Sequence, residues 1–151
     1  MELTQFLIKA KTHTYATGGE GGERILVDGS KELTFEEGGF VYRDRYFGFD
    51  PFIGEEVVWQ AGEVVWAMNY YGWVVKPMVA AGEVYQFLQR AMRQVETDRP
   101  FRGPSHYAEG DFEYHDASQG SVEGFQGKEK ILYKGREVYH LVYHGGLVRS
   151  A

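Results

Sequence analysis

Apolar and polar residues alternate along several stretches of the chain, which is the pattern of strands that bury one face. In residues 66–70 and 139–143, an aromatic or aliphatic side chain occupies every second position. Residues 40–42 and 112–114 place aromatic rings at the same spacing. The alternation predicts that these four segments are strands of an antiparallel sheet with a strongly aromatic inner face.

Turn residues separate the predicted strands. Residues 60–63 and 134–136 contain a glycine beside polar residues and are typical of tight hairpin turns. Apolar residues at 33–35 predict a further strand in the first half of the chain. We expect no counterpart of this strand in the second half, because Pro100 and Pro104 occupy that stretch and proline is poorly tolerated inside a sheet.

Two segments have helical spacing instead. Their apolar side chains recur three or four residues apart, which places them on one face of a helix. These faces consist of Leu3, Phe6, Leu7 and Ala10 in the first segment and of Val84, Phe87, Leu88, Ala91 and Val95 in the second. Glu83 lies in the first turn of the second helix and Arg90 lies later, as the helix dipole favours. We therefore expect two amphipathic helices that pack on the sheet.

The order of these elements repeats along the chain, which predicts an internal duplication. The aligned segments are 2–7 with 83–88, 37–44 with 109–116, and 54–72 with 127–145. We expect one domain over residues 1–151, made of repeats of about 1–76 and 77–151. The predicted fold class is α+β, with two helices packed on antiparallel sheet. A pseudo-twofold axis would relate the repeats and leave a cleft between them.

Composition excludes several classes of function. The chain contains no cysteine, which excludes disulfides, thiolate metal sites and cysteine nucleophiles. Its net charge of −6 disfavours binding to nucleic acid. No apolar run approaches the roughly 20 residues that span a membrane, and the N-terminal segment lacks the basic region of a secretory signal. We therefore expect a cytoplasmic protein that binds neither nucleic acid nor a membrane.

The repeats also help to separate residues that serve the fold from residues that could form a site. Asp44 aligns with Asp116, and Glu56 aligns with Glu129. Because these carboxylates occur in both repeats, we interpret them as structural. Polar or aromatic residues that occur in one repeat alone are the better candidates for a functional site.

Arg43 and Arg45 occur in the first repeat only. In a strand they share the face opposite Asp44, with guanidinium groups roughly 6–7 Å apart, and together they could bind a carboxylate or a phosphate. The alternative is ion pairing across the hairpin with Glu32 or Glu36. The two interpretations differ in whether the arginines face a ligand or a neighbouring strand.

Further candidates lie on the last strands of each repeat. Trp73 and Tyr71 could wall an apolar or cation-binding pocket, or could simply pack against the other repeat. Asn69, His140 and His144 fall on the face opposite the predicted core. If this face is covered, they are buried polar groups that need partners. If it is open, they are solvated surface residues.

The histidines predict no metal site. His140 and His144 are four residues apart, which on a strand separates them by about 13 Å. His13, His106 and His115 form no cluster with carboxylates at the spacing of metal ligands. We therefore expect no metal and no cofactor.

Several motifs together resemble a prokaryotic family that is known only as a domain of unknown function. These motifs are GGEGGE (18–23), ELTFEEG (32–38), YRDRYFG (42–48), PFIGEE (51–56), WAMNYYG (66–72), FRGP (101–104) and YHGG (143–146). The resemblance spans nearly the whole chain but implies no activity. In some members a similar domain follows a DNA-binding helix-turn-helix, a segment that we do not find in this sequence. That context implies an effector-binding module, like the duplicated α+β effector domains of the gyrase-inhibitory-protein-like group.

We expect a small-molecule-binding domain with its site between the repeats. The candidate ligand-binding residues are Arg43, Arg45, Tyr46, Asn69, Tyr71, Trp73 and His144. Two alternatives stay open, although we do not expect an enzyme. One is a metal-independent enzyme of unknown reaction class, with His144, Tyr71 and Asp44 as acid–base candidates. The other is a protein-interaction module whose exposed aromatic residues form the face of a homodimer or of another complex.

Overall fold

The computed structural model describes residues 1–17, 22–75 and 78–151, and in these ranges it contains two helices and nine strands. The helices are α1 (Leu3–Thr17) and α2 (Ala81–Met92). The strands are β1 (Arg24–Ile25), β2 (Lys31–Glu37), β3 (Phe40–Gly48), β4 (Phe52–Gln60), β5 (Glu63–Val74), β6 (His106–Glu109), β7 (Phe112–Ser121), β8 (Gly124–Tyr133) and β9 (Arg136–Leu147). The architecture confirms the α+β class.

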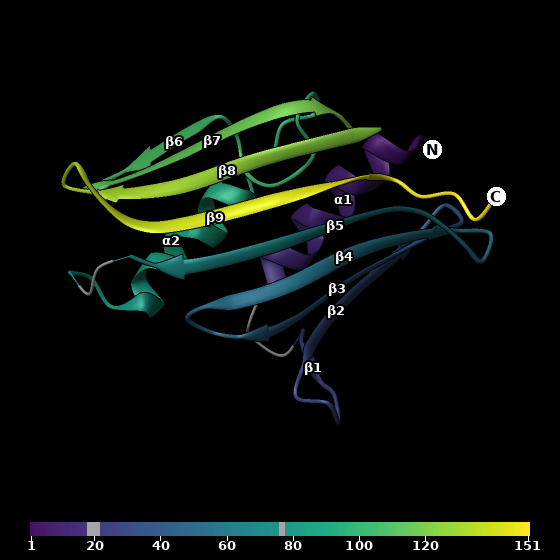
Figure 1. Ribbon diagram of the computed structural model, residues 1–151, viewed down its shortest axis with the longest axis horizontal. Helices are drawn as coiled ribbons and strands as arrows, with labels where there is room; N and C mark the ends of the chain where they lie inside the picture. The colour runs from purple at the N-terminus through teal and green to yellow at the C-terminus, as the bar shows by residue number, and fades with distance from the viewer. Residues whose placement is uncertain (18–21, 76–77) are drawn as a thin grey trace.

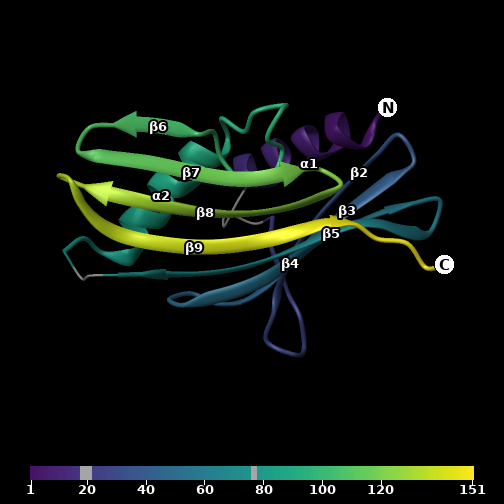
Figure 2. The same cartoon turned by 45° about the horizontal axis from the view of Figure 1, so that its top comes forward.

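All nine strands belong to one antiparallel sheet with the order β1-β2-β3-β4-β5-β9-β8-β7-β6. Both helices lie on the same side of this sheet (Figures 1 and 2). Apart from the short edge strand β1, the sheet consists of two meanders, β2–β5 and β6–β9, that meet where β5 pairs with β9. At this junction Tyr70 lies directly opposite Tyr143.

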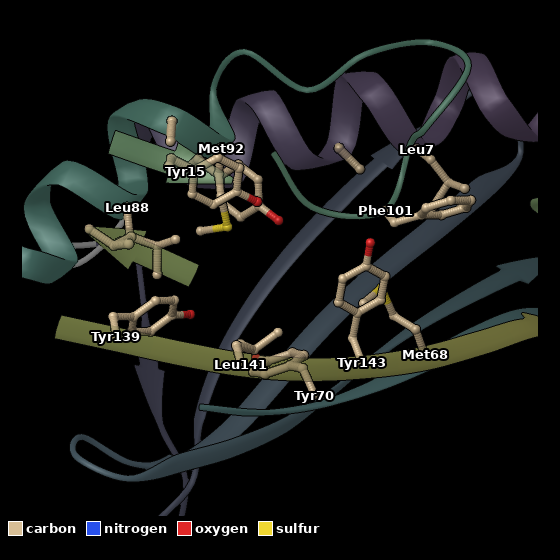
Figure 3. Packing of buried hydrophobic residues seen from close by; sticks show 14 of the residues in the cluster. Leu7, Tyr15, Met68, Tyr70, Leu88, Met92, Phe101, Tyr139, Leu141 and Tyr143 are labelled. Atoms are coloured by element: carbon tan, nitrogen blue, oxygen red, sulfur yellow. The ribbon is translucent and has the colours of Figure 1, made fainter. Parts of the chain in front are cut away.

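The predicted alternation defines the two faces of the sheet. Trp66, Met68 and Tyr70 of β5 point inward with Tyr139, Leu141 and Tyr143 of β9, and all six are buried. Figure 3 shows Tyr15, Leu88 and Met92 projecting from the helices toward Tyr70, Tyr139 and Leu141. The core is therefore an aromatic layer between the helices and the inner face.

Both predicted helices form with the expected apolar faces. In α1, Phe6, Leu7 and Ala10 are fully buried. In α2, Val84, Phe87, Leu88 and Ala91 are buried. The second helix is shorter than its apolar spacing predicts, because it ends at Met92 and leaves Val95 in the following segment.

The predicted hairpin turns are confirmed. Ala61 and Gly62 between β4 and β5 have φ angles of 51° and 83°, and Lys134 and Gly135 between β8 and β9 have φ angles of 50° and 79°. Two consecutive positive φ angles are the geometry of a type I′ turn, whose twist matches that of the flanking strands.

The expectation of a missing strand in the second half was wrong. Strand β6 pairs with β7 through Glu109 and Phe112, as β2 pairs with β3 through Glu37 and Phe40. Pro100 and Pro104 lie in the segment before β6, so they remove no hydrogen bond from the sheet. The internal duplication itself stays a prediction. None of the described helices is both long and apolar enough to cross a membrane.

Candidate functional site

Two inner-face tyrosines lie across glycines of the neighbouring strand. Tyr70 of β5 is paired with Gly54 of β4, and Tyr143 of β9 is paired with Gly127 of β8. A Cβ atom at Gly54 would lie 2.3 Å from the Tyr70 hydroxyl oxygen, and one at Gly127 would lie 2.2 Å from that of Tyr143. Each position therefore needs glycine so that the tyrosine ring can cross the strand.

These tyrosines donate hydrogen bonds to buried aspartates. The Tyr70 hydroxyl lies 2.5 Å from Asp44 Oδ1, and the Tyr143 hydroxyl lies 2.8 Å from Asp116 Oδ1. Burial is the main cause that raises the pKa of each aspartate to about 7, and a neighbouring buried glutamate raises it further. The tyrosine hydrogen bond acts in the opposite direction in both cases. Asp44 and Asp116 are thus carboxyl groups that exchange protons near neutral pH.

The glutamates beside them are paired with buried cations. Lys11 Nζ of α1 lies 2.6 Å from Glu56 Oε1 of β4, and both side chains have no solvent exposure. The same oxygen accepts a hydrogen bond from Tyr42, at 2.5 Å. Lys11 also donates to the Phe101 carbonyl oxygen, at 2.7 Å. Burial lowers the pKa of Lys11, and the charge of Glu56 opposes this effect.

The second glutamate has a fuller set of partners. Arg102 donates to both carboxylate oxygens of Glu129, at 2.7 and 3.2 Å, which is the bidentate geometry that arginine favours. Tyr114 and Tyr139 each donate a further hydrogen bond to Glu129, at 2.6 Å. A buried charge needs such compensation, because its transfer out of water is costly.

A cavity of about 320 Å³ lies between the helices and the first meander. Its aromatic wall consists of Tyr15, Tyr46, Phe49, Phe52, Tyr70 and Tyr85. Its polar lining residues include Thr14, Glu23, Lys31, Asp44, Gln89 and Arg102. The volume is that of a site for a small ligand, and the mixture of apolar walls with few polar groups is typical of such sites. We call this space the inner cavity.

Two buried polar atoms near the inner cavity lack a hydrogen-bond partner within the described ranges, namely the Tyr15 hydroxyl and Glu56 Oε2. Burial raises the pKa of Tyr15 well above its usual range, so its hydroxyl is protonated at neutral pH. Such an atom is costly to bury without a partner. Tyr15 itself is one of the residues that line the inner cavity.

Strand alternation divides the predicted site residues between the two faces of the sheet. Tyr46 points inward to the inner cavity, where its hydroxyl donates a hydrogen bond to Glu23. Arg45, Asn69, Tyr71 and His144 line a separate groove of about 600 Å³ on the outer face. The seven candidates therefore do not form one cleft, because residues an odd number apart in a strand face opposite sides.

Two of the polar candidates on the outer face reach solvent and need no buried partners. Asn69 and His144 are exposed, and His140 is half-buried. Arg45 forms the alternative contact that the sequence suggested, an ion pair with Glu32 at 3.3 Å. Arg43 instead places its guanidinium carbon 4.9 Å from the centre of the Trp59 ring.

Trp73 belongs to the same outer surface. Its ring lies 5.4 Å from that of Tyr71 and 5.0 Å from that of His140. Beside it, a row of apolar side chains crosses four neighbouring strands of the outer face. This row consists of Phe47, Ile53, Tyr71 and Val142, each opposite the next. Each of these four side chains is between 38% and 53% exposed. The outer groove is thus bordered by an apolar row that faces solvent.

Most residues of the inner cavity are not predicted by the sequence. Recurrence of Asp44 in the second half predicts a structural role for it, although it is also an acid–base candidate for an enzyme. Tyr15 and Gln89 drew no attention, because only the packing of α1 and α2 brings them to the sheet. The signal that could have found Asp44 is its place in the alternation, since it shares the inner face with Tyr42 and Tyr46.

The prediction that the histidines form no cluster with a carboxylate was also wrong. His106 of β6 lies directly opposite His115 of β7, and the two rings are 4.9 Å apart. Glu113 Oε2 lies 3.1 Å from Nε2 of His115. The spacing of nine residues between the histidines hid this contact, because the β6–β7 hairpin brings them together.

Comparison with protein families gives one match, and it covers most of the inner cavity. A family described as "Domain of unknown function (DUF5680)" matches residues 44–148. This range includes Asp44, Tyr70, Tyr85 and Arg102 of the cavity lining. Curated proteins and solved structures give no match. The association with a helix-turn-helix stays a prediction. The match confirms the resemblance that the sequence motifs suggested, and the chain belongs to the DUF5680 family.

Proposed function

We propose that this protein is a small-molecule-binding domain and that its ligand occupies the inner cavity. The observation that carries the proposal is the Asp44 carboxyl group, which is 8% exposed and lines a cavity of about 320 Å³ with six aromatic side chains. Residues of both halves contribute to this lining, since Tyr46 and Tyr70 come from the first and Tyr85 and Arg102 from the second. A pocket with apolar walls and convergent polar groups is the usual form of a ligand site.

The chemistry of the lining supports a class of ligand. Aromatic walls favour a ligand with a flat apolar body. A buried polar group of the protein adds specificity when a group of the ligand forms a hydrogen bond with it. Asp44 and Tyr15 are both buried residues of this lining, at 8% and 6% exposure. The ligand would therefore combine an aromatic or aliphatic body with one amine or hydroxyl group that reaches these two residues.

The experiment compares two substitutions on one helix. Gln89 of α2 lines the inner cavity, whereas Gln86 of the same helix is exposed and lies outside it. Gln89→Trp should fill the cavity, and Gln86→Trp should leave it open. Saturation-transfer NMR with a panel of small aromatic amines, phenols and aromatic carboxylic acids should find saturable binding to the wild type and to Gln86→Trp. Gln89→Trp should weaken that binding at least tenfold.

A third variant, Tyr71→Ala, tests whether the ligand binds in the outer groove instead. Tyr71→Ala alters the outer groove but not the inner cavity. Binding that survives Gln89→Trp and is lost in Tyr71→Ala would place the site on the outer face and overturn the proposal. Absence of binding by every member of the panel would also count against a small-molecule site and would favour the interaction module, whose surface would include the exposed apolar row.

A second candidate function is acid–base catalysis by Asp44. It is supported by the pKa of this carboxyl group, which burial raises to about 7, because a general acid or base works best when its pKa is near the working pH. The other two acid–base candidates, His144 and Tyr71, are exposed on the outer face and lie away from Asp44. Recovery of a bound panel compound after incubation separates the functions, since a binding domain returns it unchanged and an enzyme converts it.

We also infer that the two halves arose by internal duplication. Support comes from the β5–β9 register, in which Tyr70 faces its aligned residue Tyr143. Residues on either side pair symmetrically, with Asn69 opposite His144 and Tyr71 opposite Val142. A twofold axis between the two tyrosines would produce this register. The repeated contact of glycine, tyrosine and aspartate in both halves supports the same inference.

A further inference from the structure

We propose that His106, His115 and Glu113 form a binding site for a divalent transition-metal ion, for which Zn²⁺ is the best-fitting common ion. The site lies on the outer face of the β6–β7 hairpin, at the end of the sheet opposite β1. It involves no residue of the inner cavity, so the metal-site proposal does not depend on the proposed ligand site.

The hairpin brings the three side chains together on one face. His106 and His115 are direct cross-strand neighbours, and Glu113 is two residues before His115 on the same strand. Side chains at such positions point to the same side of a sheet, with the two directly opposed Cβ atoms roughly 5 Å apart. One donor atom from each residue lies within 4.8 Å of the other two. The backbone of the hairpin therefore fixes the cluster before any ion binds.

The distances suit a tetrahedral ion. Zinc bonds to histidine nitrogen and carboxylate oxygen of about 2.0–2.2 Å place two ligand atoms roughly 3.3 Å apart. The Glu113 and His115 atoms are already 3.1 Å apart. Because His106 and Glu113 are exposed and His115 is half-buried, small side-chain rotations can close the remaining gap without disturbing the core. Two imidazole nitrogens and one carboxylate oxygen form a ligand set that zinc accepts, with a fourth position for water.

Two neighbouring residues, Ala108 and Lys130, affect how the site can bind a cation. Ala108 lies opposite Glu113 and two residues from His106, so it occupies the fourth corner of the cluster and leaves that corner free of a bulky side chain. Lys130 of β8 lies opposite His115, and its positive charge opposes cation binding. The site thus has a free corner at Ala108, and the charge of Lys130 weakens its affinity for a cation. One substitution at each position can change these two effects.

Isothermal titration of the tag-free protein with Zn²⁺ tests the proposal. The wild type should bind one ion per chain, and thermal unfolding should shift upward in zinc, since an ion that binds the folded state stabilises it. We expect zinc affinity to fall by roughly tenfold or more in each of His106→Gln, Glu113→Gln and His115→Gln. Loss of a residue that only supports a metal ligand already weakens binding by about tenfold, and loss of the ligand itself should cost at least as much. These variants should remain folded in the absence of zinc, because none of the three residues is in the core.

Two further variants should strengthen binding. Lys130→Gln removes the opposing charge, and Ala108→His supplies a fourth donor at the free corner. A matched control is His144→Gln, which removes an exposed histidine from the same face outside the cluster, and it should leave zinc affinity unchanged. The proposal is overturned if the wild type binds Zn²⁺ more weakly than about 1 mM. It is equally overturned if the three ligand variants bind zinc as tightly as the wild type, which would mean dispersed binding to surface histidines.

Discussion

The two meanders of the sheet each bury a cluster of two tyrosines, one aspartate and one glutamate, but the residues that cover these side chains differ. The first cluster consists of Tyr42, Asp44, Glu56 and Tyr70, and the second of Tyr114, Asp116, Glu129 and Tyr143. In the second cluster Arg99 lies 3.4 Å from Asp116, and Arg102 covers Glu129. In the first cluster Lys11 pairs with Glu56, but Asp44 faces the inner cavity.

This difference indicates where function can arise in a structure with similar halves. Arginines from the segment between α2 and β6 close the second cluster, so its carboxylates serve stability. The first cluster keeps a buried carboxyl group, Asp44, that lines the inner cavity, and the Tyr70 hydroxyl lies beside it. Residues that recur in both halves can therefore differ in role, and Asp44 and Asp116 are the clearest pair.

The largest expected effect comes from removal of the buried cations. Arg102→Met leaves Glu129 buried without its bidentate partner, and we expect the free energy of unfolding to fall by about 3–5 kcal/mol. Lys11→Met should cost less, because burial already lowers the pKa of Lys11 and offsets part of its interaction with Glu56. Denaturation in urea measures both losses.

The control for these variants is an exposed ion pair. Lys9 lies 2.8 Å from Glu37 at the surface, and Lys9→Met should change stability little, since exposed pairs are screened by water. A loss for Arg102→Met as small as that for Lys9→Met would show that the closed cluster does not depend on its arginine.

A smaller effect is expected at the two glycines under the tyrosines. Gly54→Ala and Gly127→Ala should each lower the free energy of unfolding by about 1–3 kcal/mol, because the added methyl group overlaps the tyrosine ring. Gly124→Ala is the control, since a Cβ atom there would have no neighbour within 4 Å among the described residues. Chemical denaturation gives the three values.

Similar losses at Gly54 and Gly127 would support the equivalence of the halves. Tyr70→Leu combined with Gly54→Ala should cost less than the sum of the two single changes, because the overlap disappears with the ring. Additive losses would show that the close approach of Tyr70 to Gly54 is not the reason for the glycine.

The last expected effect concerns the pH dependence of stability. Asp44 and Asp116 have pKa values raised from 3.8 to about 7, so the folded state binds more protons than the unfolded state between these values. Each therefore contributes stability that is fully present below pH 3.8 and is lost as the pH rises through about 7. Asp44→Asn and Asp116→Asn should each make the decline of stability over this range shallower, as measured by urea denaturation at several pH values.

The exposed residue Asp98 provides the comparison for the pH series, because Asp98→Asn should leave the slope unchanged. A ligand in the inner cavity would then distinguish the two buried aspartates. Its binding should shift the titration of Asp44 in carbon-detected NMR and leave that of Asp116 in place. Equal shifts at both residues would contradict the assignment of the cavity to the first cluster.

Much of the fold could be predicted from local patterns. Alternation identified the inward side chains of β5 and β9, and turn residues identified the hairpins at Gly62 and Gly135. These features depend on near neighbours along the chain. Strand β6 was missed because its sequence is short and polar and follows two prolines, and its existence depends on pairing with β7.

The buried ion pairs and the candidate site were harder to predict because they depend on long-range contacts. Lys11 and Glu56 are 45 residues apart, yet their charged atoms lie within 2.6 Å. The sequence predicts Arg45 and Tyr46 in one site, although adjacent residues of a strand face opposite sides. Recurrence in both halves predicts a structural role for Asp44 as well as for Asp116. However, the arginine that covers Asp116 comes from a segment without a strict repeat.

By itself, the amino-acid sequence determined the α+β class, the family, the inner face of the central strands and the tight turns. The class, the inner face and the turns follow from spacing along the chain, since side-chain direction and turn geometry depend on adjacent residues. The family follows from the resemblance of several sequence motifs. Only the tertiary structure decided which carboxylates are paired, which one reaches the inner cavity, and that His106 meets His115 across a hairpin. Those outcomes depend on how the helices and the two meanders pack, because burial and distance are properties of segments that are remote in the sequence.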